Sequence, residues 1–140
     1  MGKNKFDLSH YLTIVGILLE SQIKDGSIPI KILNCYGVCQ EKKSFWEHIL
    51  QSGLLYDENL ILGGDLNIIM DFEESWGTHA RIVSTTPFFK SFFQRLNLIE
   101  IWSGKKAPTW HNGRRGEFHI GKRLDIFLIK DSILDNFSFH

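Results

Sequence analysis

The chain has 140 residues, 43% of them hydrophobic and 13% aromatic, and its 16 basic and 16 acidic side chains leave no formal net charge. This length and apolar content suit one globular core, and they exclude intrinsic disorder as well as the collagen-like and coiled-coil classes, which need a fixed repeat. Because Cys35 and Cys39 can neither build a disulfide framework nor complete a zinc site, we expect free thiols.

The first segment in chain order, residues 1–7, lacks the apolar run and the small-residue cleavage site of a signal peptide. The nearest apolar stretch is too short to span a bilayer. We therefore expect an intracellular protein, nuclear or cytoplasmic, that is neither secreted nor inserted in a membrane.

Two runs rich in β-branched residues follow, over 11–19 and 28–36, with the tripeptide Asp-Gly-Ser at 25–27 between them. Asp-Gly turn chemistry between two such runs predicts a β-hairpin. Pro29 is tolerated near the start of the second strand.

Helical spacing of apolar residues appears next, between residues 41 and 52, and Gly53 is a natural stop. We expect an amphipathic helix there. The apolar run at 59–64, which ends in two glycines, predicts a buried strand that leads into a tight loop.

A second helix is predicted to begin at Thr86, as N-cap, with Pro87 at its first position, and to run to about Leu96 with a phenylalanine-rich apolar stripe. The glycines at both ends of 113–116 indicate a turn, and 124–129 is typical of a strand. Strands alternate with helices, so the predicted class is mixed α/β or α+β.

Charge is distributed unevenly along the chain. Between Lys43 and Arg81 there are seven acidic residues and no Lys or Arg, whereas 105–123 is basic with interspersed aromatic residues. Acidic residues that hold a metal beside basic residues that hold phosphates would give this pattern. Two solvated faces of opposite sign would give it as well.

The segment with the most chemical information is Gly64-Asp65-Leu66-Asn67. A carboxylate and an amide two residues apart, just past a buried strand, point the same way and can share one metal ion or one phosphate. An Asx-type turn after the strand is the alternative interpretation.

Five motifs occur in a fixed order: Asn34-Cys35-Tyr36-Gly37, Phe45-Trp46, Gly64-Asp65-Leu66-Asn67, Thr109-Trp110-His111-Asn112 and Arg123-Leu124-Asp125-Ile126-Phe127-Leu128-Ile129. Together they resemble the endonuclease/exonuclease/phosphatase family, and within it the endonuclease domain of plant LINE-type (non-LTR) retrotransposons. The resemblance runs from about residue 33 to 129. It implies the α+β class, as a partial four-layer α/β sandwich of two β-sheets flanked by helices, with residues 1–140 forming a single incomplete domain. It also implies a Mg²⁺-dependent site at one rim that cleaves phosphodiesters.

The same resemblance implies roles for four residues. Asp65 matches the acid that orients or deprotonates the attacking water, and Asn67 the amide that holds a phosphate oxygen and water; both would be metal ligands. Tyr36 matches a tyrosine whose hydroxyl contacts the phosphate. Asp125 matches the acid that orients the catalytic histidine.

Further positions would support or bind the substrate. Arg123 and Trp110 resemble framework positions beside the site, and Trp110 is also a candidate substrate contact. Arg114 and Arg115 are candidates for contacts to a DNA backbone, with a solvated turn as the alternative.

The chain also departs from the family pattern. The family has an early Asn and a Glu that is its principal Mg²⁺ ligand, and nothing before Tyr11 matches either, so we expect the chain to begin partway through the domain. The family's later Ser-Asp-His motif has no match, since His140 is too close to Asp125 and lacks the preceding acid. Val38 stands where proline is usual. We therefore expect impaired catalysis, because residues that act as a unit lose most of their effect when one is missing.

Three functions remain open at this point. The first is a fragment of a metal-dependent DNA endonuclease of retrotransposon origin. The second is a catalytically dead relic that binds nucleic acid or metal weakly. The third, a phosphatase of the same family acting on small phosphate esters, is disfavoured by the retrotransposon-like motifs. DNA is the expected partner, and the oligomeric state does not follow from the sequence.

Overall fold

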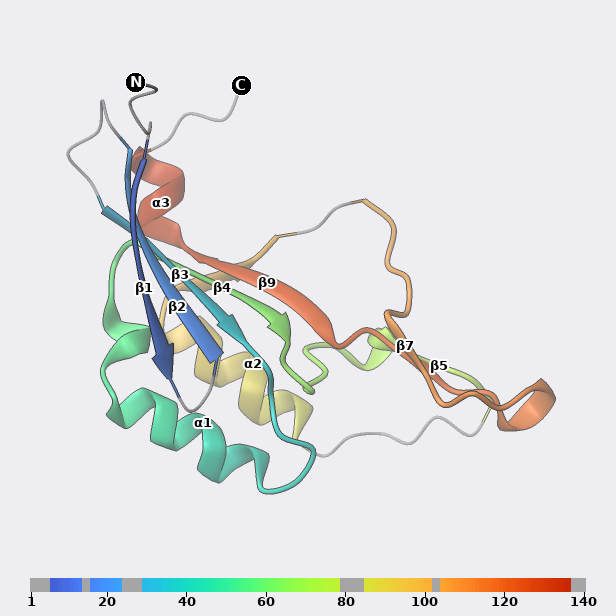
Figure 1. Cartoon of the computed structure of the whole chain (residues 1–140). Helices are drawn as coiled ribbons and strands as arrows, with labels where there is room; N and C mark the ends of the chain where they lie inside the picture. Colours follow the sequence, from blue (N-terminus) through green and yellow to red (C-terminus); the bar gives the residue numbers. More distant parts are fainter. Residues whose placement is uncertain (1–5, 14–15, 24–28, 79–84, 102–103, 137–140) are drawn as a thin grey trace.

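The computed structural model describes residues 6–13, 16–23, 29–78, 85–101 and 104–136. Its main element is a six-stranded sheet with the order β1-β2-β3-β4-β9-β6 (Figure 1). The strands are β1 (Phe6–Thr13), β2 (Gly16–Ile23), β3 (Pro29–Cys35), β4 (Leu60–Asp65), β6 (Leu98–Glu100) and β9 (Asp125–Lys130). Only the β3–β4 pair is parallel among these strands; the other four pairs are antiparallel.

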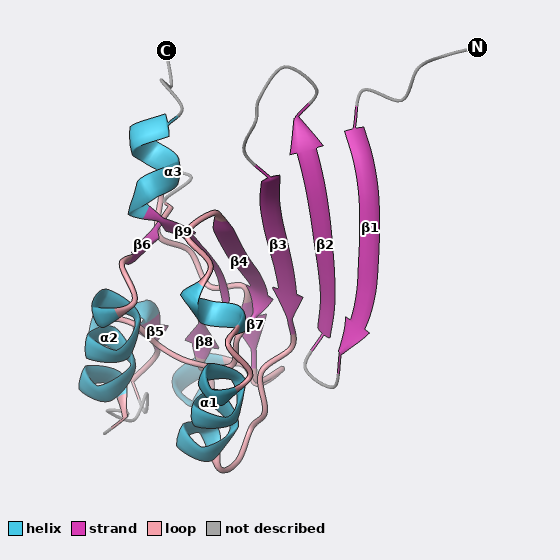
Figure 2. Ribbon diagram, turned by 90° about the vertical axis from the view of Figure 1, so that its left-hand side faces the viewer, coloured by secondary structure: helices cyan, strands magenta, loops and turns pink. Residues whose placement is uncertain are grey.

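Two helices, α1 (Lys42–Gln51) and α2 (Thr86–Arg95), cover one face of this sheet (Figure 2). Their apolar stripes supply Trp46 and Phe93, both fully buried, whose rings meet edge to face with centroids 5.2 Å apart. The sheet contributes alternate residues to the same core, such as Leu62 on β4, because side chains alternate between the two faces of a strand. A third helix, α3 (Asp131–Asn136), follows β9 directly.

The other face of the sheet carries apolar side chains that remain partly exposed. Ile32, Ile99 and Phe127 are 37%, 44% and 55% exposed. The Phe127 ring lies against Gly63 on the neighbouring strand, where a Cβ would be 2.4 Å from the ring. Glycine at this position therefore makes room for the ring.

A second, three-stranded sheet with the order β5-β8-β7 forms an arm that extends beyond one end of the large sheet (Figure 1). It contains β5 (Ser75–Trp76), β7 (Trp110–His111) and β8 (Gly121–Lys122). The 3₁₀ turns are η1 (Leu54–Tyr56), η2 (Phe72–Glu74) and η3 (Gly116–Phe118), and η3 lies between β7 and β8. We call residues 108–123 the arm hairpin.

The predicted α+β class, with two sheets and flanking helices, is confirmed. Both predicted helices are present, with ends within a residue or two of those predicted. Gly53 follows Ser52, the C-cap of α1, and has a φ of +83°. The strands predicted at 59–64 and 124–129 are β4 and β9. No helix in the described ranges is long and apolar enough to cross a membrane.

Two predictions for individual elements need correction. The run at 11–19 is not one strand: β1 ends at Thr13, β2 begins at Gly16, and the two strands pair antiparallel, although the two β-branched residues between them in the sequence give no turn signal. The N-cap of α2 is Thr85 rather than Thr86, a shift within the usual uncertainty of helix ends. The hairpin predicted between the two runs exists as β2 and β3, while its Asp-Gly-Ser turn lies outside the described residues.

Candidate active site

The candidate site begins where β4 ends. Gly64 has a φ of +120°, and a Cβ there would lie 2.3 Å from the carbonyl oxygen of Cys35 on β3, so only glycine fits this close strand pair. Asp65, the last residue of β4, accepts a hydrogen bond at its backbone oxygen from the Gly37 N–H at 2.7 Å. The end of β4 is thereby joined to the loop that follows β3.

Asn67 adopts a left-handed conformation, with a φ of +53°. Its backbone N–H donates to Oδ1 of Asp65 at 3.0 Å, and its side-chain Nδ2 donates to the Gly37 carbonyl at 2.8 Å. The Asx-type turn is therefore present. It holds the carboxylate and the amide on one side of the turn, and the amide oxygen is the atom that a cation would take.

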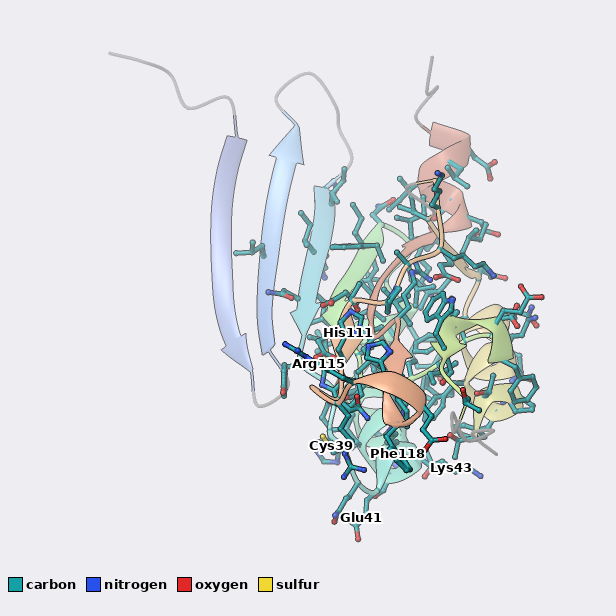
Figure 3. All side chains as sticks on the ribbon, turned by 90° about the vertical axis from the view of Figure 1, so that its right-hand side faces the viewer. Cys39, Glu41, Lys43, His111, Arg115 and Phe118 are labelled. Carbon is teal, nitrogen blue, oxygen red and sulfur yellow. The ribbon has the colours of Figure 1, made fainter. Side chains whose placement is uncertain are left out.

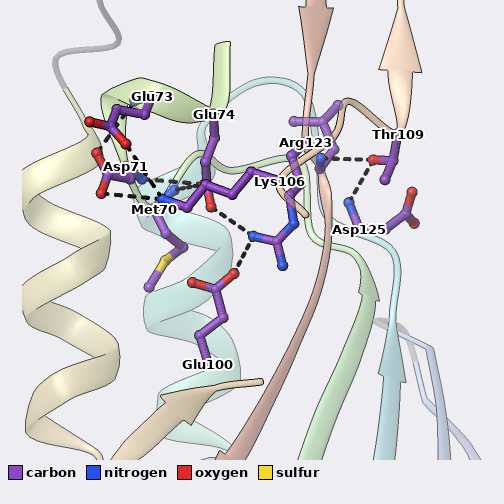
Figure 4. A network of polar contacts seen from close by, with 10 residues as sticks. Met70, Asp71, Glu73, Glu74, Glu100, Lys106, Thr109, Arg123 and Asp125 are labelled. Atoms are coloured by element: carbon purple, nitrogen blue, oxygen red, sulfur yellow. Dashed lines mark hydrogen bonds and ion pairs between the residues drawn. The ribbon is translucent and has the colours of Figure 1, made fainter. Parts of the chain in front are cut away.

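Asp125 lies directly opposite Asp65 in the antiparallel β4–β9 pair. Opposite residues of such a pair present their side chains on the same face, so the two carboxylates are neighbours. The Thr109 hydroxyl accepts hydrogen bonds from the backbone N–H groups of Leu124 and Asp125, at 3.0 and 3.1 Å (Figure 4). Thr109 thus fixes the start of β9 against the arm hairpin.

Tyr36 follows β3, which runs parallel to β4, so it reaches the same edge of the sheet as Asp65. Its side chain is 70% exposed. A Cβ on the next residue, Gly37, would be 1.9 Å from the Leu66 carbonyl oxygen, which explains why glycine stands there. The motif order predicts that Tyr36, Asp65, Asn67 and Asp125 converge at one rim. The strand pairing places Asp65 opposite Asp125, and a hydrogen bond joins Asn67 to Gly37, the residue after Tyr36.

Arg123 is held in an ion-pair network with two glutamates. Its guanidinium forms an ion pair with the fully buried Glu74 at 2.7 Å and a second pair with Glu100 (Figure 4). Burial raises the pKa of Glu100, although its hydrogen bond with Arg123 opposes the shift. Glu74 also accepts the N–H groups of Met70 and Asp71. The sequence patterns did not single out either glutamate, since nothing in them marks an acid as buried.

The acidic and basic segments pair with each other in part. Besides the Glu74–Arg123 contact, Lys106 lies 3.9 Å from Asp71 and 3.8 Å from Glu73. These contacts bring acidic and basic side chains of the two segments together, so their charges partly neutralise each other. Of the seven acidic residues between Lys43 and Arg81, Asp65 is the one at the end of β4.

The predicted substrate contacts divide into two groups. Trp110, on β7, lines a pocket of about 250 Å³ together with Asn67. Arg114 and Arg115 are exposed at the η3 end of the arm hairpin and do not line this pocket. Figure 3 looks onto this side of the molecule, with Arg115 on the hairpin.

Both cysteines are free, as predicted. Burial raises the pKa of the Cys35 thiol to about 11, so it stays protonated and packs as an apolar side chain. Cys39 is exposed and lies close to Asn67, with its Sγ 3.5 Å from Nδ2.

The donor atoms at this edge of the sheet suit Mg²⁺ in kind. This ion keeps several waters and is commonly held by one or two carboxylates. The carboxylates of Asp65 and Asp125 and the amide oxygen of Asn67 offer that donor set. In the described parts of the chain there is no group of three or more His, Cys, Asp or Glu side chains that could hold a metal ion. The residues fit a magnesium ion that is largely bound by water.

The fold of this chain resembles that of solved structures. The chain matches the structure of the endonuclease domain of TRAS1, a telomere-specific non-LTR retrotransposon, with a TM-score of 0.71 and 18% identity over 96% of this chain. It spans 60% of the TRAS1 chain. A truncated TDP2 from Caenorhabditis elegans matches at a TM-score of 0.48 and 16% identity, over 91% of this chain and 55% of that one. No protein-family model and no curated protein matches.

The chain therefore shares the fold of the part of the TRAS1 endonuclease domain that it matches, in agreement with the resemblance predicted from the order of the motifs. At this identity the likeness establishes the fold alone. The chemistry of this chain has to be argued from its own residues.

Proposed function

We propose that this chain is part of a metal-dependent DNA endonuclease or phosphodiesterase domain of retrotransposon origin, with residues 1–140 belonging to one incomplete domain. The observation that carries the proposal is the gathering of Asp65, Asn67 and Asp125 at one sheet edge beside the exposed Tyr36. A nuclease-like fold supports it. A sheet edge at which carboxylates lie next to an amide and a phenol suits phosphodiester hydrolysis.

In this proposal Asp65 and Asn67 would hold Mg²⁺, and the bound ion would supply positive charge to polarise the phosphate. Asp65 also orients or deprotonates the attacking water. Tyr36 donates its hydroxyl hydrogen bond to a phosphate oxygen. Asp125 stands where the family orients its histidine, and here it adds negative charge beside Asp65.

Catalysis by this chain is proposed to be weak. The described residues offer two neighbouring carboxylates and one amide, and no larger metal-ligand cluster. Mg²⁺ bound by so few protein ligands is poorly directed. Residues that act as a unit are strongly non-additive, so an incomplete set retains little of the rate.

We expect purified chain to give no more than trace nicking of supercoiled plasmid in Mg²⁺, measured at high protein concentration over many hours, and we expect Asp65→Ala to abolish it. Glu73→Ala is the matched control, because Glu73 is an exposed acid next to Lys106 and away from β4.

Equal nicking by wild type and Asp65→Ala would remove the enzymatic proposal. Robust nicking that depends on Asp65 would instead contradict the proposed weakness, and would mean that other residues supply the missing groups.

A nucleic-acid-binding module without catalysis is the second candidate. The exposed Arg114 and Arg115 at the end of the arm hairpin favour it, because a projecting basic loop can follow a phosphate backbone. DNA binding together with a nicking rate that is the same in Asp65→Ala would select this candidate.

A further inference from the structure

The pocket beside Asn67 gathers side chains that no motif singled out. Its cations are Lys42, which is the first residue of α1, and Lys122, which lies on β8 of the arm hairpin. Asn67 and Trp110 also line it, and the buried Ile69 and Leu124 form its apolar part. Residues 80 positions apart in the sequence thus bring two ammonium groups to the edge of the candidate active site.

The positive charge of Lys122 acts on Lys42 in this pocket. Burial lowers the pKa of Lys42, and the charge of Lys122 lowers it further, while Cys39 and Asp65 oppose the shift. The Lys122 Nζ lies 5.8 Å from the centre of the Trp110 ring, within cation–π range. Within residues 29–78, 85–101 and 104–135, neither lysine has a carboxylate at ion-pair distance. Two like charges that share a partly buried pocket are stabilised when an anion joins them.

We propose that this pocket binds a backbone phosphate of DNA, held between Lys42 and Lys122 beside the phosphodiester that would meet Asp65. The inference rests on the proposed function and specifies its substrate contact. Lysine serves as a point charge for phosphate, and its half-buried stem leaves the ammonium free to reach the ligand. Trp110, 41% exposed at the same pocket, offers an aromatic surface to the sugar or base next to that phosphate, which a free phosphate ion would not use.

The test measures binding of a fluorescein-labelled 12-base-pair DNA duplex by anisotropy, in EDTA and over a range of KCl concentrations. Each lysine that neutralises one phosphate contributes about 0.9 to the slope of log K against log[KCl]. We expect Lys42→Gln and Lys122→Gln each to lower the slope by about that amount and to weaken binding about eightfold at 0.1 M KCl. Lys42→Arg should restore the slope, because the charge is kept.

Lys43→Gln is the matched control. It removes the same charge from the adjacent position of α1, but its ammonium lies 4.7 Å above the Phe88 ring and Lys43 does not line the pocket. Its slope should equal that of the wild type. An unchanged slope in Lys42→Gln and Lys122→Gln would overturn the inference, as would wild-type protein that does not bind the duplex.

A competition with inorganic phosphate separates the two possible sources of the anion. Phosphate should displace the duplex no better than chloride does at equal ionic strength. Displacement at low phosphate concentration that both lysine variants abolish would mark a small-anion site and would contradict the proposal. Because EDTA removes any metal, this binding experiment does not depend on metal-dependent nicking. Absence of Asp65-dependent nicking would count against the proposed function, and absence of the lysine effect on the salt slope would count against this inference.

Discussion

Replacing Arg123 by Met is expected to lower the free energy of unfolding by about 3–5 kcal/mol, because removing one partner of a buried ion pair leaves an uncompensated buried charge. Glu74 is fully buried and Glu100 is partly buried, and both pair with the same guanidinium. The measurement is urea unfolding followed by far-UV circular dichroism.

The double variant Glu74→Gln/Arg123→Met is the control. A neutral amide keeps an oxygen for the N–H groups of Met70 and Asp71 without a buried charge, so we expect it to recover about 1–2 kcal/mol relative to Arg123→Met. A loss below about 1 kcal/mol in Arg123→Met would show that the Glu74–Arg123–Glu100 network contributes little to stability.

Phe93→Ala should cost a similar amount, about 3–5 kcal/mol, through lost burial and the cavity that remains. Phe93 is fully buried and its ring packs edge to face on both Trp46 and Phe92. The same unfolding experiment measures it. Typical domains are stable by only about 5–15 kcal/mol, so this variant is expected near the limit of folding.

Phe72→Ala is the matched control for size, since Phe72 is 51% exposed on η2. A change within about 0.5 kcal/mol is expected there. Equal losses in Phe72→Ala and Phe93→Ala would contradict the described core.

Much of the fold is predictable because its main elements have clear periodicity. The helices at 42–51 and 86–95 and the strands at 60–65 and 125–130 follow directly from apolar spacing and from glycine and proline positions. The division of the run at 11–19 into β1 and β2 is not predictable in this way, since the β-branched residues between Thr13 and Gly16 carry no turn signal in the sequence. The two-residue strands β5, β7 and β8 are too short to show any alternation.

The candidate site was predictable only through the motifs. Asp65 and Asn67 stand out locally, but nothing local connects them with Asp125, which is 60 residues away and becomes a neighbour through the β4–β9 register. Lys42 and Lys122 belong to no motif, and a lysine on a helix face is ordinarily a solvated residue. Tertiary structure alone brings them into one pocket.

Metal binding at the end of β4 and the start of β9 is the central claim, and paramagnetic NMR tests it most directly. Mn²⁺ prefers the same oxygen ligands as Mg²⁺ and broadens amide signals near it. In a titration of ¹⁵N-labelled chain, we expect the signals of Gly37, Asn67 and Asp125 to broaden first in the wild type and to stay sharp in Asp65→Asn. Broadening centred on Asp71 and Glu73, or broadening unchanged by Asp65→Asn, would contradict the account.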